Sequence, residues 1–208
     1  MSGKGGSPNT DALNFHVCLM WDGGSPPFVD GRELAETVQS ILIDDVDNWS
    51  DGLLQALASC APATGGAEGP GGVAGQLLLG APYELRRCQT PQWFDPERAS
   101  ALFARTVATA RQDLRRINRA SLMAPGARWS RLAAHLELLA VLAAVMRPMM
   151  PGWSAFVLEE LGMSPQTHWP WDAVWGHPLL RRGQRLPGHL PGYFERWHPD
   201  TLSDRTVS

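Results

Sequence analysis

The residues of this chain best suited to bind a ligand are arginines spaced one helical turn apart. Five arginines lie within fifteen residues, namely Arg105, Arg111, Arg115, Arg116 and Arg119. Arg111, Arg115 and Arg119 follow one another at intervals of four, so on a helix they share one face. Such a row can bind phosphates, as in RNA, or form ion pairs with carboxylates. The spacing alone leaves open an internal ion-pair network, a nucleic-acid surface and a surface for a partner protein.

A second group of ionisable residues is acidic and lies earlier in the chain. Asp44, Asp45 and Asp47 cluster there, and Glu33 and Glu36 precede them. Paired carboxylates can act as general acid and base when burial drives their pKa values apart. The polar neighbours of this cluster instead favour a solvated face, and its charge makes it the natural partner of the arginine row. We therefore expect internal pairing of the two groups and keep an acidic cleft as a weaker enzyme hypothesis.

The sequence offers no other set of catalytic or metal-binding residues. The three cysteines are far apart, C-x-x-C and H-E-x-x-H are absent, and so is the G-x-S-x-G motif of a serine nucleophile. His135 lies in an apolar stretch and fits a satisfied histidine within a bundle. The Gly-rich stretch 61–76 lacks the lysine of a phosphate-binding loop and is interpreted as a flexible linker. We expect no metal and no cofactor.

The elements that must position these residues are helices. Asp30 and Glu33 fit a capping box, and an apolar stripe follows at steps of three and four from Leu34 to Leu57. A second helix begins at Asp95-Pro96 and carries the arginines to Ile117. A third runs from about Ala127 to Arg147, apolar almost all round. A short helix, 153–161, ends at Gly162. The run 14–21 is interpreted as a strand or a buried extended piece.

These elements predict an all-α protein: a helical bundle of four or more helices with an extended Trp-rich C-terminal tail. We expect a flexible N-terminal lead-in at 1–27, the bundle at 28–175 and the tail at 176–208. Nine tryptophans stand against two tyrosines. Four tryptophans could stack on nucleic-acid bases, namely Trp153, Trp169, Trp171 and Trp175. Packing of the tail on the core is the favoured interpretation.

Composition limits the class of partner. The chain has 208 residues and a net charge of −3, which disfavours a protein that coats DNA, although a local basic face remains open. The longest apolar run without charge is nine residues, between Glu137 and Arg147, about half of what a membrane span needs. The polar N-terminus has no apolar signal core. We expect a cytoplasmic protein that binds neither DNA nor a membrane.

One stretch resembles a known family. From Arg147 to Gly162 the chain reads RPMMPGWSAFVLEELG. This is similar to the end of the anticodon-binding bundle in class I aminoacyl-tRNA synthetases of the methionyl type, where an apolar helix, Pro-x-Met-Pro and a short helix closed by Leu-Gly follow one another. Trp169-Pro-Trp-Asp172 is similar to the sequence that comes next, and the resemblance covers roughly residues 28–175. It implies a helical anticodon-binding domain.

The departures from the family are informative. The H-x-G-H and K-M-S-K-S motifs of the catalytic fold are absent, so the resemblance implies that this chain does not activate an amino acid by itself. The family's first bundle helix carries an Asn and, four residues later, an Arg that read the anticodon. The alignment puts Asn48 on the Asn and Gly52 on the Arg, so half of that pair is missing.

That pattern resembles a branch of methionyl-synthetase-like proteins in natural-product pathways, which join amino acids without tRNA, including steps toward nitrogen–nitrogen bonds. Three stretches are similar to that branch: 82–86 (PYELR), 91–96 (PQWFDP) and 186–194 (LPGHLPGYF). The resemblance implies a non-catalytic C-terminal module that docks on a separate synthetase-like catalytic chain, within an ATP-dependent ligase. The alternative is a stand-alone tRNA-binding module, with Asn48, Arg111, Arg115 and Arg119 as its nucleic-acid-binding residues.

Overall fold

The computed structural model describes residues 7–25, 27–60, 72–163 and 186–197, and within these ranges it contains helices and no strand. This confirms the all-α helical bundle. The helices, in chain order, are α1 (Pro8–Leu19), α2 (Gly31–Thr37), the π-helix η1 (Val38–Asp47), α3 (Asn48–Ala58), α4 (Gly72–Cys88), the 3₁₀ turn η2 (Pro91–Trp93), α5 (Pro96–Arg119), α6 (Pro125–Met146) and α7 (Pro151–Glu160).

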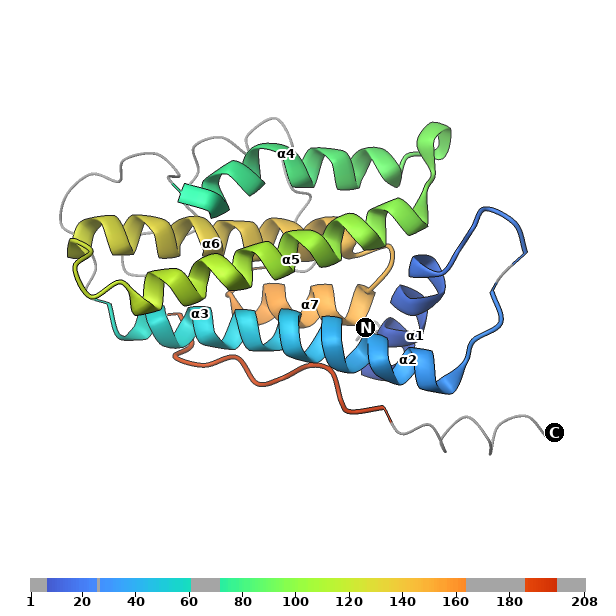
Figure 1. The fold of residues 1–208 in the computed structure, drawn as a ribbon, viewed down its shortest axis with the longest axis horizontal. Coiled ribbons are helices and arrows are strands. Elements are labelled where there is room, and N and C mark those ends of the chain that lie inside the picture. Colours follow the sequence, from blue (N-terminus) through green and yellow to red (C-terminus); the bar gives the residue numbers. More distant parts are fainter. Residues whose placement is uncertain (1–6, 26, 61–71, 164–185, 198–208) are drawn as a thin grey trace.

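The long helices run side by side, with α6 among them (Figure 1). α6 packs against α3, α4, α5 and α7, and most of its side chains are buried. Among the described helices, α6 is the one whose length and composition would allow it to cross a membrane. However, 67% of its most apolar stretch is buried inside the bundle. That burial is what a core helix requires, and it agrees with the sequence prediction that this helix is the central one.

The first predicted helix is continuous from Gly31 to Ala58 but contains a π-helical segment, η1. Its buried residues Leu34, Val38, Leu42 and Val46 are spaced by four throughout. In a straight α-helix each such step would rotate the stripe by about 40°. A π-helix holds more residues per turn, so it keeps all four side chains on the core side.

The predicted helix boundaries at caps are confirmed. The Asp30 carboxylate accepts hydrogen bonds from the backbone N–H of Arg32 (2.7 Å) and of Glu33 (3.3 Å). Asp95 accepts from the N–H of Arg98 at 2.9 Å, and Pro96 follows it in the first turn of α5. Gly162 has φ +69° after α7, the left-handed residue that ends a helix.

Two predictions from the sequence are wrong. The run 14–21 is not a strand, because its first six residues belong to α1. Phe15 of α1 is fully buried, and its ring packs edge-on against the ring of Phe103, with 5.7 Å between the ring centres. A short apolar run has no clear period, whereas Ser7 and Pro8 supply a cap and a first helical residue. α1 also falls within the segment expected to be a flexible lead-in.

The second error concerns the expected linker at 61–76. Residues 72–76 form the start of α4, and residues 61–71 lie outside the described ranges. Glycines and the internal Pro82 weaken the local helix signal. Burial of Ala74, Leu78, Leu85 and Cys88 against α5 and α6 outweighs that weakness.

The part of the C-terminal tail that is described, 186–197, is extended and lies along η1 and α3 (Figure 1). Phe194 and Leu190 are its buried side chains. Three aspartates of the bundle bind this segment, as set out below. Of the four tryptophans considered for base stacking, Trp169, Trp171 and Trp175 lie outside the described residues. Trp153 is 1% exposed and packs on Phe103, so packing rather than base stacking is confirmed for it.

Candidate functional site

The arginine row of α5 divides into a paired and an unpaired part. Arg111 lies nearest the middle of the helix, and its guanidinium donates to the carboxylate of Asp45 on η1 at 2.5 Å. The two side chains are 22% and 21% exposed, so water screens the pair only partly. Internal pairing of the arginine row with the acidic helix, predicted from the sequence, is thus confirmed for Arg111.

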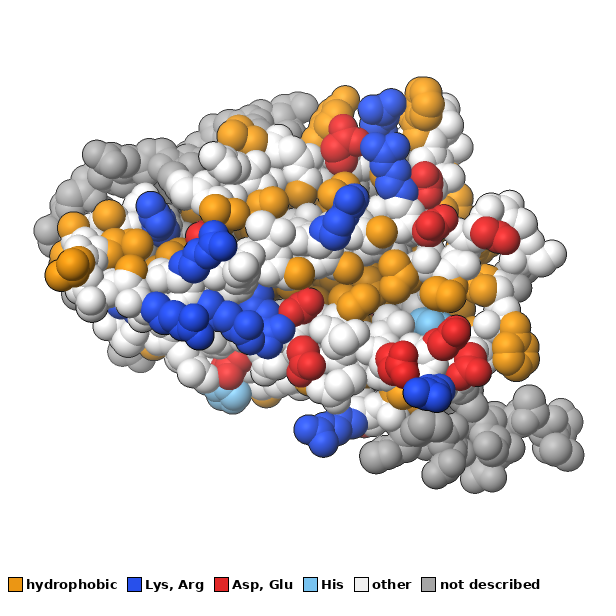
Figure 2. Space-filling model, in the orientation of Figure 1, with side chains coloured by type: hydrophobic (Ala, Val, Ile, Leu, Met, Phe, Trp, Pro, Cys, Tyr) orange, Lys and Arg blue, Asp and Glu red, His pale blue; other side chains and the backbone are white. Residues whose placement is uncertain are grey.

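The rest of the row is exposed and lacks acidic partners. Arg115 and Arg119 are exposed, as is Arg116 beside them, and among the described residues none of the three forms an ion pair. Figure 2 shows basic side chains gathered where α5 meets α3. Arg116 and Arg119 stand in the last turn of α5, where cations also complement the negative end of the helix dipole. The surface could bind phosphates, and part of its charge is explained by the helix alone.

Asn48 is exposed at the start of α3, one turn beyond the Asp45 that pairs with Arg111. Its side-chain amide donates to the backbone carbonyl of Asp44 at 3.3 Å, so its carbonyl oxygen stays available to a ligand. Gly52, four residues later, faces α5: a Cβ there would stand 3.8 Å from Leu114. The residue that replaces the expected Arg therefore lies at a helix–helix contact rather than on the basic surface.

The acidic cluster does not form a shared site. Asp44 accepts from the amide of Gln39 at 3.0 Å, Asp45 from Arg111, and Asp47 from the backbone N–H of Phe194 at 2.9 Å. The three carboxylates thus bind three different partners. This arrangement does not support the acidic cleft that the sequence left open, because acid–base chemistry needs two carboxylates facing one substrate.

Aspartates instead hold the C-terminal segment. Besides Asp47, Asp51 accepts from the ring of His189 at 2.8 Å and from the N–H of Leu190 at 3.1 Å. Asp11 of α1 accepts from the Tyr193 hydroxyl at 3.0 Å and from the N–H of Trp153 at 2.6 Å. Burial raises the pKa of Asp47 to about 6 and also raises the pKa of Asp11, because little water remains to solvate their charges.

A buried polar chain joins three helices beneath the arginine row. The Trp49 indole N–H donates to Nδ1 of His135 at 3.3 Å, and Nε2 of His135 lies 3.2 Å from the carboxylate of Asp113. Because Nδ1 accepts, Nε2 carries the proton and donates to Asp113. His135 is fully buried. It is the satisfied bundle histidine that the sequence favoured, and Asp113, the one acid among the arginines, faces inward.

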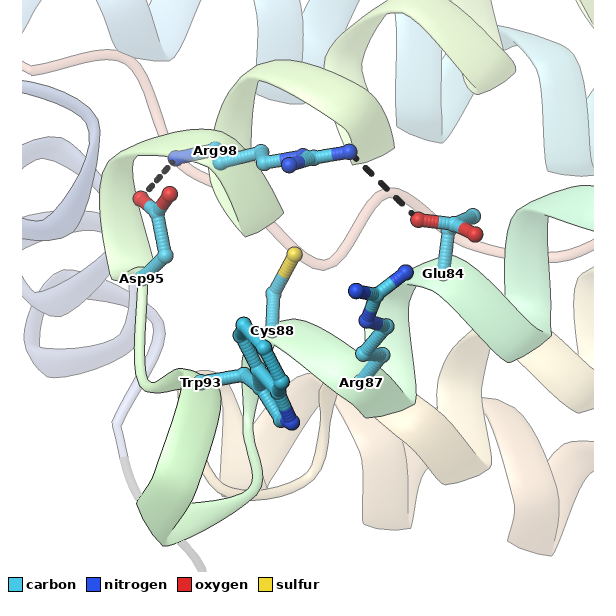
Figure 3. Close-up of a pocket in the computed structure, with 6 residues that line it drawn as sticks. All are labelled: Glu84, Arg87, Cys88, Trp93, Asp95 and Arg98. Carbon is cyan, nitrogen blue, oxygen red and sulfur yellow. Dashed lines mark hydrogen bonds and ion pairs between the residues drawn. The ribbon is translucent and has the colours of Figure 1, made fainter.

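A pocket of about 130 Å³ lies at the corner where α4 ends, η2 turns and α5 begins. Figure 3 shows its lining: Glu84, Arg87, Cys88, Trp93, Asp95 and Arg98. Arg98 reaches Glu84 at 3.5 Å, and the Arg87 guanidinium lies 4.9 Å from the centre of the Trp93 ring. The thiol of Cys88 points into the pocket; burial raises its pKa, so it stays protonated at neutral pH.

Sequence reasoning assigned no function to this corner. Of its lining residues, Glu84, Trp93 and Asp95 fall in the stretches 82–86 and 91–96, which resemble a family, and Asp95 was also predicted as a helix cap. The sequence did contain a sign of an exposed aromatic surface here, because Tyr83, Trp93 and Phe94 fall outside any apolar stripe. Among the residues that the structure describes, no group of three or more metal-binding side chains occurs, at this corner or away from it.

Comparison with known proteins places the fold. No family model and no curated protein matches the chain. Among solved structures, its helical bundle is similar to part of a methionyl-tRNA synthetase. That structure is the apo, free-state form of the enzyme from Mycobacterium tuberculosis, with a TM-score of 0.69 and 19% sequence identity. The match covers 91% of this chain and 39% of that one. At this identity the likeness establishes the fold alone, a helical bundle similar to part of a methionyl-type synthetase.

Proposed function

We propose that this chain is a non-catalytic helical module of a methionyl-tRNA-synthetase-like ligase and docks on a separate chain that carries the catalytic fold. The observation that carries the proposal is the structural match, which takes up nearly all of this chain and 39% of the synthetase. The absence of the H-x-G-H and K-M-S-K-S motifs agrees with the proposal, because in an ATP-dependent ligase a second chain would then supply them.

The ligase that we propose joins amino acids without tRNA, in the natural-product branch that leads to nitrogen–nitrogen bonds. Two observations support this finer proposal. Gly52 stands where an anticodon-reading Arg is expected, and it packs by Leu114. Arg111, the most central of the row, is already paired with Asp45. Both reduce the surface available to an anticodon.

The test is co-expression with a synthetase-like chain of the source organism that has H-x-G-H but no helical module of its own. We expect the two chains to co-purify as a stable 1:1 complex, with the mass measured by light scattering after gel filtration. Separate elution of two folded chains at micromolar concentration would contradict the proposal.

A stand-alone tRNA-binding module is the second candidate function, and a specific observation favours it. Arg115 and Arg119 are exposed, one turn apart, and form no ion pair with any described residue. Binding through them would weaken with salt, because each phosphate contact releases counterions. The double variant R115A/R119A should lower the slope of log affinity against log salt by about 1.4 to 1.8.

The matched control for that titration is R87A, since Arg87 is likewise an exposed arginine in the last turn of a helix. Its tRNA affinity and salt slope should equal those of the wild type. Binding that does not depend on salt, or that R115A/R119A leaves unchanged, would contradict a phosphate-binding role for the arginine row.

A further inference from the structure

We propose that the corner between α4 and α5 is the surface on which the catalytic chain docks, through an apolar patch of that chain carrying a carboxylate that binds Arg87. We call this surface the Trp93 corner and define it by Leu79, Tyr83, Arg87, Trp93 and Phe94. The inference rests on the proposed function, and it names the face of this chain that the partner covers.

Exposed apolar side chains are concentrated at this corner. Leu79, Tyr83, Trp93 and Phe94 are 60%, 69%, 60% and 64% exposed, and they make up four of the seven large hydrophobic residues that are exposed in the described part of the chain. Large aromatic side chains gain stability when they leave water, so a cluster of them on the surface marks an interaction site. Trp, Tyr, Phe and Arg are also the residues enriched in protein interfaces.

The backbone at the corner is held by helix α4 and by hydrogen bonds within the turn that follows it. Leu79 and Tyr83 are four residues apart on α4, so they share a face. The turn that carries Trp93 is closed by two backbone hydrogen bonds, from the Trp93 N–H to Thr90 at 3.0 Å and from the Asp95 N–H to Cys88 at 2.8 Å. A backbone that is already held has less conformational entropy to lose on binding, which favours affinity.

The charges at the corner leave one cation unmatched. Glu84 pairs with Arg98, and Asp95 caps α5 through the Arg98 N–H. Arg87 stacks on Trp93 and, among the described residues, has no carboxylate partner. Figure 3 shows its guanidinium beside the open pocket. A guanidinium fixed beside an aromatic ring binds a carboxylate in a defined geometry, so the complementary partner presents an acid within an apolar patch.

The corner also lies apart from the arginine row. Trp93 and Phe94 precede α5, whereas Arg115 and Arg119 stand near its other end. The 24 residues of α5 span about 36 Å. The partner surface and the phosphate-binding surface are therefore distinct. The occupant that fits is the catalytic chain, because the matched synthetase holds more than half of its residues outside the bundle that this chain reproduces.

The experiment measures binding of the co-expressed catalytic chain to purified variants by calorimetry. We expect W93A and F94A each to weaken binding by about tenfold or more, as loss of a central interface aromatic does. R87M should weaken it as well and should remove most of the salt dependence, because it keeps the apolar stem and loses the charge. Since these side chains are exposed, the variants should unfold at the wild-type temperature.

Two controls match the variants in chemistry but not in place. L122A removes an exposed apolar side chain that is 98% accessible at the other end of α5, and R116M changes a last-turn arginine of α5 as R87M does in α4. Both should bind like the wild type. Wild-type binding that W93A, F94A and R87M leave unchanged overturns the Trp93 corner while the proposed function stands. Failure of the wild type itself to bind overturns both.

Discussion

At the scale of single residues, aspartates carry much of the tertiary structure. Asp11, Asp47 and Asp51 come from two separate parts of the bundle, and each accepts hydrogen bonds from the C-terminal segment. A carboxylate is a strong acceptor, so it can satisfy backbone N–H groups of a segment that has no strand or helix of its own. Within the acidic cluster of the sequence, Asp47 thus binds the C-terminal segment and Asp45 binds Arg111.

The burial of Asp47 predicts how stability depends on pH. The residue is 8% exposed and its pKa in the folded protein is about 6, above the value of 3.8 expected when unfolded. Folding then favours the protonated form. The stability that Asp47 contributes is fully present below about pH 4 and is lost as pH rises through 6. The difference amounts to about 3 kcal/mol.

The variant D47N tests this. An Asn at this position can still accept from the Phe194 N–H but has no charge to bury. We expect D47N to match the wild type near pH 4 and to exceed it in free energy of unfolding by about 2–3 kcal/mol at pH 7. Denaturant titrations at several pH values measure the difference. Burial lowers the pKa of His16, so its contribution to stability rises with pH. This contribution is the same in the wild type and in D47N, so it drops out of the difference between them. Parallel pH profiles would contradict the assignment.

At the scale of the element, α6 is the helix on which the bundle depends. It contacts four other helices, and Leu132, Leu136 and Leu139 are among its fully or almost fully buried residues. Asp113 and Trp49 reach it through His135, so a polar chain as well as apolar packing joins it to its neighbours. A cavity at an α6 side chain therefore weakens packing with several helices at once.

Leu136→Ala should lower the free energy of unfolding by about 2–5 kcal/mol, the cost of lost burial plus a cavity. The side chain is 1% exposed. Urea denaturation followed by circular dichroism measures the change. The matched variant L122A removes the same atoms from a side chain that is 98% exposed, and it should stay within about 0.5 kcal/mol of the wild type. Equal effects of the two variants would contradict the placement of α6 in the core.

At the scale of the whole molecule, two surfaces lie far apart along α5. The Trp93 corner precedes its first turn, and Arg115 and Arg119 stand near its last. Because they share no residue, a ligand on one leaves the other accessible. The helix between them is anchored by Asp95 at its start and by the Arg111–Asp45 pair toward its end, so the separation is fixed.

This arrangement predicts independent binding. If tRNA binds the arginine row, adding it should change the affinity for the catalytic chain by less than about twofold, since linkage requires the two sites to bias a common state. Calorimetric titration of the catalytic chain into the protein with and without saturating tRNA measures the coupling. Mutual exclusion of the two ligands would show that the surfaces overlap and would contradict the separation.

The sequence by itself determined the helical class, the caps at Asp30 and Asp95, the end at Gly162, and the central place of α6. These features depend on local geometry and on periodicity, which are readable from neighbours in the chain. It also predicted the likeness to the methionyl-type bundle from residues 147–162, and the comparison of structures supports that likeness for the fold.

Only the tertiary structure decided which charges are used internally and which are free. Arg111 pairs with Asp45 across 66 positions of the chain, and Asp47 binds Phe194 across 147. Such partners depend on packing between distant elements, which no local pattern encodes. The helix α4, weak in local signal because of glycines and Pro82, forms because α5 and α6 bury its apolar face. The Trp93 corner exists for the same reason: it is made where two packed helices meet.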